Sequence, residues 1–475
     1  MPIHHTTGES QPETRKHGPR VALVTPYDGG NLGDAAIQDS MISNLRLRMP
    51  DVQFLGITLN GDNFVSQHGA TVTFPLLASG LSSRNGSRRS SPPESGAVAH
   101  PGAASEPPRR KSRNPVRWAL ASIPGLVPFL KKARTSVTAV GREIAHSYEG
   151  YRILRTQDVL LISGGGQLDE EYGGPWRLPF TIFKWTLLAR LARIPCAMAS
   201  IGAGKVTSPT SRRLVAMAAR MCSYRSFREE KSRGIVAGIF PPAITDSVVP
   251  DLAFSMPESN LPASLGVIRT MARGRPVVAL SPIAYGKPVN WPTADRALHE
   301  RYVQQLADIL RRLSGLGYFT VLVCSSLGDD ESVIPEILER LDGETKHSLE
   351  GQIYFPAIKT WRDLVTVLRD ADYLIASRLH GTILGFLSRT PVIAISFDPK
   401  VDWVMEDLKQ TDYLLHIRDF TAEATLDALG RIKADRNAAL EHIVSYRKDI
   451  ISSSASARQY DLLAGLALKH YQSHP

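Results

Sequence analysis

The chain has 475 residues, 43% of them hydrophobic and 21% charged, which is ordinary for a globular protein and more than one hydrophobic core usually supports. Its net charge of +10 favours an anionic partner, and its three cysteines, none in a CxxC pair, argue against a disulfide framework or structural zinc. The N-terminus lacks the apolar stretch of a signal peptide, and charged residues or prolines interrupt the longest apolar runs. We therefore expect a soluble, cytoplasmic protein of two domains.

Short apolar runs alternate with helix-period stretches along the chain, which is the pattern of βαβ units in a parallel sheet. The first set of runs predicts strands near residues 21–27, 52–60, 72–76, 158–163, 196–201 and 224–227. The second set predicts strands near 277–282, 318–324, 352–355, 373–376 and 392–397. Each set can close one domain, so the predicted fold is α/β, with two Rossmann-like domains facing a cleft.

The composition predicts four parts: a disordered lead at 1–19, an N-terminal domain at 20–255, a linker at 256–275 and a C-terminal domain at 276–475. A basic insertion rich in Ser, Pro and Arg, at about 80–134, interrupts the first domain. Its first part, 80–113, is predicted to be disordered. The basic, partly apolar stretch that follows is interpreted either as a covering helix or as a segment lying on an anionic membrane surface.

The first predicted strand is followed by G-G-N-L-G-D-A-A-I, residues Gly29 to Ile37, which opens a helix. Backbone N–H groups at such a turn, around Gly33, can bind a phosphate or carboxylate. The turn lacks the endings typical of ATP and NAD sites. Asn31 is either a turn residue or a ligand amide. Asp34 is either the N-cap of the helix or a base for an acceptor hydroxyl.

A second glycine-rich turn, S-G-G-G-Q-L-D-E-E-Y, follows the apolar strand before Ser163. Consecutive glycines at a strand end let a ligand approach the backbone closely. The candidate binding residues in this turn are Gly164, Gly165, Gly166 and Gln167.

The carboxylates of this turn, Asp169, Glu170 and Glu171, lack an adjoining histidine and calcium-loop spacing, so we interpret them as solvated and predict no metal. A third turn contains Gly202 and Gly204 and matches the dinucleotide pattern incompletely. These two glycines are expected to line the cleft at most.

Two arginines flank the end of the sixth predicted strand, in S-Y-R-S-F-R-E-E-K-S. Alternation along the strand lets one face the cleft while its neighbour Arg225 is solvated. Arg228, at the strand end, is better placed for bidentate binding of a carboxylate or phosphate. A surface salt bridge is the alternative for this segment.

The segment from Ser377 to Lys400 directly follows the predicted strand near 373–376 and contains a helix and a second strand, and polar residues follow each strand. Two neighbouring parallel strands therefore deliver Arg378, His380 and Lys400 to one carboxyl edge, where open α/β sheets bind ligands. A single histidine is usually structural, but the two adjacent cations favour a catalytic role for His380.

These motifs, in this order and together with V-V-P-D-L-A-F, resemble the polysaccharide pyruvyl transferase family from Arg20 to about Gly465. The resemblance implies a glycosyltransferase-B-like fold. It also implies transfer of the pyruvyl group of phosphoenolpyruvate onto two hydroxyls of a sugar, as a ketal, with release of phosphate. No cofactor is implied beyond phosphoenolpyruvate as donor.

The resemblance also implies roles for single residues. Arg228, Arg378 and Lys400 would hold the donor, His380 would be the general acid, and Asp34 or Asp169 would assist the hydroxyls. The N-terminal domain would be the acceptor side and the C-terminal domain the phosphoenolpyruvate side. The acceptor would be a cell-surface polysaccharide or glycolipid precursor, free or lipid-linked, and no nucleic acid is expected.

The chain departs from the family where Glu229 follows Arg228, since family members commonly have Asp there, and in its basic insertion. Two alternatives stay open. One is a glycosyltransferase of the same fold that uses a nucleotide sugar. The other is a non-catalytic protein that binds anions or a membrane surface through its basic insertion.

Overall fold

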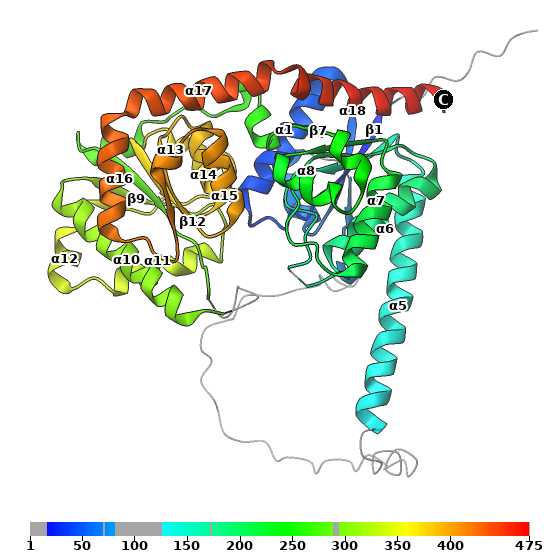
Figure 1. Ribbon diagram of the computed structural model, residues 1–475, viewed down its shortest axis with the longest axis horizontal. Helices are drawn as coiled ribbons and strands as arrows, with labels where there is room; N and C mark the ends of the chain where they lie inside the picture. The colour runs from blue at the N-terminus through cyan, green and yellow to red at the C-terminus, as the bar shows by residue number, and fades with distance from the viewer. Residues whose placement is uncertain (1–16, 70–71, 81–125, 172, 288–293, 475) are drawn as a thin grey trace, which may run out of the picture.

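The structure, a computed structural model, describes residues 17–69, 72–80, 126–171, 173–287 and 294–474. It contains two α/β domains side by side, each built on a parallel sheet (Figure 1). The expected disordered lead, up to residue 16, and most of the basic insertion, 81–125, lie outside the described residues.

The N-terminal sheet has the strand order β3-β2-β1-β4-β5-β6-β7, and every strand pair is parallel. Its central strand β4 reads Val-Leu-Leu-Ile-Ser and is fully buried, because helices cover both faces of a parallel sheet. The strands are β1 (Arg20–Val24), β2 (Gln53–Thr58), β3 (Val72–Pro75), β4 (Val159–Ser163), β5 (Cys196–Ile201), β6 (Tyr224–Phe227) and β7 (Ser247–Val248). The helices are α1 (Leu32–Arg48), α2 (Gly61–His68), α5 (Leu126–Leu154), α6 (Leu178–Ala192), α7 (Pro209–Met221) and α8 (Glu230–Ala237).

The C-terminal sheet has the order β10-β9-β8-β11-β12-β13 and is also parallel. Its strands are β8 (Val277–Ser281), β9 (Phe319–Leu322), β10 (Ile353–Tyr354), β11 (Tyr373–Ala376), β12 (Val392–Ser396) and β13 (Leu414–His416). Its helices are α10 (Arg296–Gly315), α11 (Val333–Glu339), α12 (Gly343–Ser348), α13 (Trp361–Leu368), α14 (Leu379–Leu387), α15 (Pro399–Asp407) and α16 (Ala422–Ala434). All eleven predicted strands are present, and the short β7 and β13 are added.

The two domains are joined more closely than the expected boundaries imply. Residues 256–275 contain α9 (Val267–Ala272), and Leu261 and Ile268 are buried in the main core. After α17 (Arg436–Ser452), helix α18 (Ser454–Ser473) returns to the N-terminal domain and packs against α1, β1 and β4 (Figure 1). The C-terminal domain therefore ends before α18, and its expected extent of 276–475 is too long.

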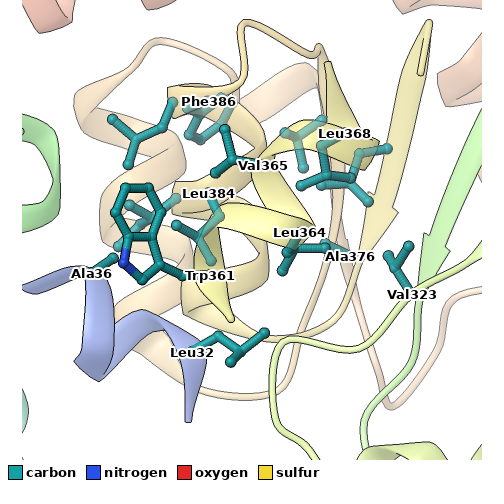
Figure 2. Close-up of a cluster of buried hydrophobic side chains, with 14 of the residues drawn as sticks. Leu32, Ala36, Val323, Trp361, Leu364, Val365, Leu368, Ala376, Leu384 and Phe386 are labelled. Carbon is teal, nitrogen blue, oxygen red and sulfur yellow. The ribbon is translucent and has the colours of Figure 1, made fainter. Parts of the chain in front are cut away.

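Helix α1 lies between the two domains. Leu32 and Ala36 belong to the same buried cluster as Trp361 and Leu384 of the second domain (Figure 2). The carboxylate of Asp39 accepts a hydrogen bond from the Trp361 indole at 2.7 Å. Because α1 is anchored in both domains, the turn that begins it has a fixed position at their junction.

Within the described residues, no helix has both the length and the apolar character needed to cross a membrane.

Candidate active site

Both sheets reverse their strand order near the middle, at β1/β4 and at β8/β11. Loops at such a point diverge and leave a crevice for a ligand. In the first domain the two glycine-rich turns, after β1 and β4, lie at this point. In the second domain the segment after β11 lies at the corresponding point. The sequence motifs therefore meet where this fold class binds ligands.

Asn31 caps α1. Its side-chain oxygen accepts hydrogen bonds from the backbone N–H groups of Gly33 (3.1 Å) and Asp34 (3.4 Å). The interpretation of Asp34 as the cap is therefore wrong, and its carboxylate in the first turn is available for another role. The Asn31 turn also bonds to the second domain, since the Leu32 N–H donates to the Ser325 carbonyl at 3.0 Å.

His380 lies over this turn, in the first turn of α14. Its Nδ1 is 3.2 Å from the Asn31 oxygen, which already accepts a backbone N–H. We therefore assign the proton to Nδ1, which leaves a lone pair on Nε2. A Cβ atom on Gly33 would stand under 3.0 Å from the His380 side chain, so the absence of a side chain there makes room for the imidazole.

Helix α14 holds His380 through close packing. A Cβ atom at Gly385 would stand 2.6 Å from Leu374 of β11 and 2.8 Å from Val392 of β12. The glycine thus lets the helix rest directly on the two strands.

His380 and Asp34 have opposite pKa shifts. The pKa of His380 is lowered to about 4, chiefly by burial. The cations Arg228 and Arg378 act in the same direction, and Asp34 opposes the shift. Burial raises the pKa of Asp34, against the opposing effect of His380 and Arg228. At neutral pH the imidazole of the free protein is therefore uncharged, and Asp34 is a stronger base than an exposed aspartate.

Arg228 follows β6 and is 6% exposed. Its Nε donates to Glu229 at 2.8 Å, and its guanidinium lies 3.6 Å from Asp251. Arg225 instead bonds Asp246 at 2.7 and 3.1 Å, so the two arginines have separate partners. A Cβ at Gly202 would be 2.7 Å from Arg228, so this glycine belongs to the site.

Arg378 forms a bidentate ion pair with Asp330. Asp330 is fully buried and also accepts the backbone N–H of Ala284 at 3.0 Å. Sequence reasoning missed Asp330, because it lies in a polar loop whose acidic residues look alike. The pair holds the guanidinium plane of Arg378 at the start of α14.

Lys400 reaches across the domain junction. Its Nζ is 3.4 Å from Asp169 of the first domain and 3.8 Å from Asp398. Asp169 and Glu170 are 4% and 9% exposed, so their interpretation as solvated is wrong. Hydroxyl groups of Thr207, Ser208 and Ser211 bond Glu170 and, against the effect of burial, hold its pKa well below the usual value.

No group of three or more His, Cys, Asp and Glu in the described part of the chain could hold a metal ion.

The glycines after β4 adopt conformations that other residues avoid, with φ of 54° at Gly164 and 74° at Gly165. A Cβ atom at Gly165 would lie 3.6 Å from Asp34, and one at Gly166 would lie 3.8 Å from the Lys400 Nζ. The amide of Gln167 donates to the Gly164 carbonyl at 2.7 Å and is buried. Gln167 thus supports the loop instead of presenting its amide to a ligand.

Six buried polar atoms near the carboxyl ends of the strands lack a hydrogen-bond partner within the described residues. Buried polar groups are nearly always paired, so such a gathering indicates a polar ligand. The atoms are Ser163 Oγ, Arg228 Nη2, Asp251 Oδ2, Ser281 Oγ, Ser325 Oγ and His380 Nε2. Sequence reasoning had not assigned roles to Asp251, Ser281 or Ser325, although Asp251 lies in V-V-P-D-L-A-F and Ser281 ends a predicted strand.

A pocket of about 490 Å³ opens beside this cluster. Residues from both domains form its polar wall: Asp28, Asn31, Asp34, Arg177, Ser326, Asp329 and Arg378. Its apolar wall consists of Pro26, Leu59, Leu76, Leu77 and Leu178. Asp34 therefore lines the open pocket, and its charge also acts on His380.

Comparisons with known proteins agree with this architecture. MnaA of S. aureus in complex with UDP is similar over 96% of this chain and 99% of its own, at 9% identity and a TM-score of 0.54. The UDP-GlcNAc 2-epimerase of Neisseria meningitidis bound to UDP-GlcNAc is similar over 95% of this chain and 100% of its own, at 11% identity and a TM-score of 0.51. Identities this low show the fold alone, and the predicted glycosyltransferase-B-like fold is confirmed.

A search of curated proteins finds no match. The family model for polysaccharide pyruvyl transferase matches residues 31–399. This range begins within the first glycine-rich turn, at Asn31, contains the second turn, Arg228, Arg378 and His380, and ends just before Lys400. The chain is therefore a transferase that belongs to the polysaccharide pyruvyl transferase family.

Proposed function

We propose that this enzyme transfers the pyruvyl group of phosphoenolpyruvate onto two hydroxyls of a sugar in a polysaccharide or glycolipid precursor. The product is a cyclic ketal, and phosphate is released. The observation that carries the proposal is the buried cluster of cations and unpartnered polar atoms around His380. It suits a small ligand that carries two anionic groups, and no cofactor is needed.

The donor side is formed by Arg228, Arg378 and Lys400. A carboxylate orients each cation: Glu229, Asp330 and Asp169 respectively. The unpartnered Nη2 of Arg228 can donate to the phosphate or carboxylate of the donor. The hydroxyls of Ser281 and Ser325 would lie 3.5 and 3.2 Å from a Cβ at Gly381, so they flank the start of α14, where the helix dipole also favours an anion.

His380 supplies the proton that turns the methylene carbon of phosphoenolpyruvate into a methyl group. In the free protein its pKa is about 4, in part because Arg228 and Arg378 repel a charged imidazole. The anionic donor offsets these two cations, so its binding raises the pKa and charges the ring. The acid form is thus produced when the substrate arrives.

Asp34 acts on the acceptor side. Its carboxylate lines the open pocket, and burial raises its pKa. The first sugar hydroxyl loses its proton to Asp34 and attacks C2 of the donor as the methylene carbon is protonated. The second hydroxyl then attacks C2, the bond to phosphate breaks, and phosphate leaves with the remaining proton. Two hydroxyl protons are lost and two are gained: His380 gives one to the methyl group and is recharged by the proton that Asp34 took up, and the second hydroxyl gives the other to phosphate.

Incubation of the protein with phosphoenolpyruvate and a panel of glycans tests the proposal. Phosphate should be released while the pyruvyl mass stays on the glycan, and the variants His380→Gln and Asp34→Asn should both lose this transfer. Phosphate release without any gain of mass on the glycan would contradict it.

A nucleotide sugar is the alternative donor, because the similar solved structures contain UDP or UDP-GlcNAc. Thermal unfolding with phosphoenolpyruvate, UDP and GDP separates the two donors, since a bound ligand raises the melting temperature. We expect stabilisation by phosphoenolpyruvate alone. Stabilisation by UDP or GDP in its place would favour glycosyl transfer.

A further inference from the structure

Helix α5 leaves the body of the N-terminal domain. Its C-terminal half packs against α6, where the Nε2 of His146 lies 2.8 Å from the Pro75 carbonyl at the end of β3. Its N-terminal half continues past this point and projects away from both domains, on the side opposite α17 and α18 (Figure 1). From residue 126 to 146 a helix covers about 30 Å at about 1.5 Å per residue.

An apolar stripe runs along the described part of this helix. Val140, Ile144 and Tyr148 follow one another at four-residue spacing and therefore share one face. They are 59%, 65% and 61% exposed, so neither domain covers them. Exposed apolar side chains in a row on one helix indicate a surface that meets another apolar phase.

The charge of the same helix identifies that phase. Over its whole length, residues 126–154, its sequence has five basic residues (Lys131, Lys132, Arg134, Arg142 and Arg152) and two acidic ones (Glu143 and Glu149), so the helix is positively charged. A second copy packed against this stripe would bring the same cations together. An anionic lipid surface instead offers both an apolar layer and compensating charge.

We propose that the stripe Val140, Ile144 and Tyr148 lies on the surface of an anionic bilayer and holds the enzyme there. The proposal concerns binding and does not depend on the reaction proposed above.

Flotation of the full-length protein with vesicles tests it. One set of vesicles is phosphatidylcholine alone, and the other is an equimolar mixture of phosphatidylcholine and phosphatidylglycerol. The triple variant Val140→Ser, Ile144→Ser, Tyr148→Ser removes the stripe. The matched control is Leu47→Ser, Leu265→Ser, Leu316→Ser, whose side chains are 71%, 75% and 63% exposed outside α5.

The wild-type protein and the control should float with the anionic vesicles alone, and rising salt should release them. The stripe variant should bind the anionic vesicles at least about tenfold more weakly than the wild-type protein. Its melting temperature and circular dichroism spectrum should be unchanged. Failure of the wild-type protein to float, or equal binding by the stripe variant, would overturn the proposal. So would a stripe variant that converts a dimer to a monomer, because the stripe would then be a protein interface.

Discussion

Substitution of Gly33 by alanine tests the packing of the catalytic histidine directly. The added methyl group would stand under 3.0 Å from three atoms of His380, whereas ordinary contact distances are 3.4–4 Å. The imidazole must therefore shift, by on the order of 1 Å, or α1 must move away from α14. Such overpacking lowers the free energy of unfolding by about 1–3 kcal/mol. The higher helix propensity of alanine raises it by up to about 1 kcal/mol.

The matched control is Gly141→Ala, in the interior of α5, where a Cβ atom meets nothing within 4 Å. This control should gain up to about 1 kcal/mol, so the two variants should differ by about 1–3 kcal/mol in chemical denaturation. An imidazole displaced by roughly 1 Å should lower kcat about 100-fold, and the control should keep the wild-type rate. A Gly33→Ala variant as stable and as active as the Gly141→Ala variant would refute this account of the His380 environment.

Three further predictions concern ionisation and charge. The folded-state pKa of His380, about 4, lies below its ordinary value, so its stabilising effect is complete above pH 6.5 and is lost as the pH falls toward 4. Between about pH 7.5 and pH 5 the wild-type protein should therefore lose about 2 kcal/mol more unfolding free energy than His380→Gln, and equal losses would contradict this. Binding of phosphoenolpyruvate should take up a proton near pH 7, measured by calorimetry in two buffers of different ionisation enthalpy; His380→Gln should abolish the uptake. Asp330→Asn leaves Arg378 without its anionic partner. This variant should lose about 3 kcal/mol of unfolding free energy and bind phosphoenolpyruvate more weakly. The control Asp246→Asn, beside Arg225, should leave the affinity for phosphoenolpyruvate unchanged.

Much of the fold could be predicted from the sequence because both sheets are parallel. Strands buried on both faces are continuous apolar runs, and β4 is the clearest case. The reversal of strand order then brings the residues after these strands together, which is why Asn31, Arg228, Arg378 and His380 were found. Helix α18 was assigned to the wrong domain, because an amphipathic pattern does not reveal which sheet the helix covers.

Local chemistry was ambiguous where two residues could do the same task. Asn31 and Asp34 are both good cap residues, and the backbone geometry of the turn decides between them. Asp169 and Glu170 looked like loop carboxylates because their partners lie far along the sequence, in Lys400 and the hydroxyls near Ser208. Asp330 was missed for the same reason, since its pairing with Arg378 exists only in the folded chain.

The most direct measurement of the central claim is the reaction in D₂O with phosphoenolpyruvate and an accepted glycan, followed by NMR of the product. Protonation of the methylene carbon from an exchangeable group on His380 predicts a ketal whose methyl group carries one deuterium. Asp34→Asn and His380→Gln should each reduce its formation. A glycan that gains an enolpyruvyl ether, with its methylene group intact and without deuterium on carbon, would contradict the account.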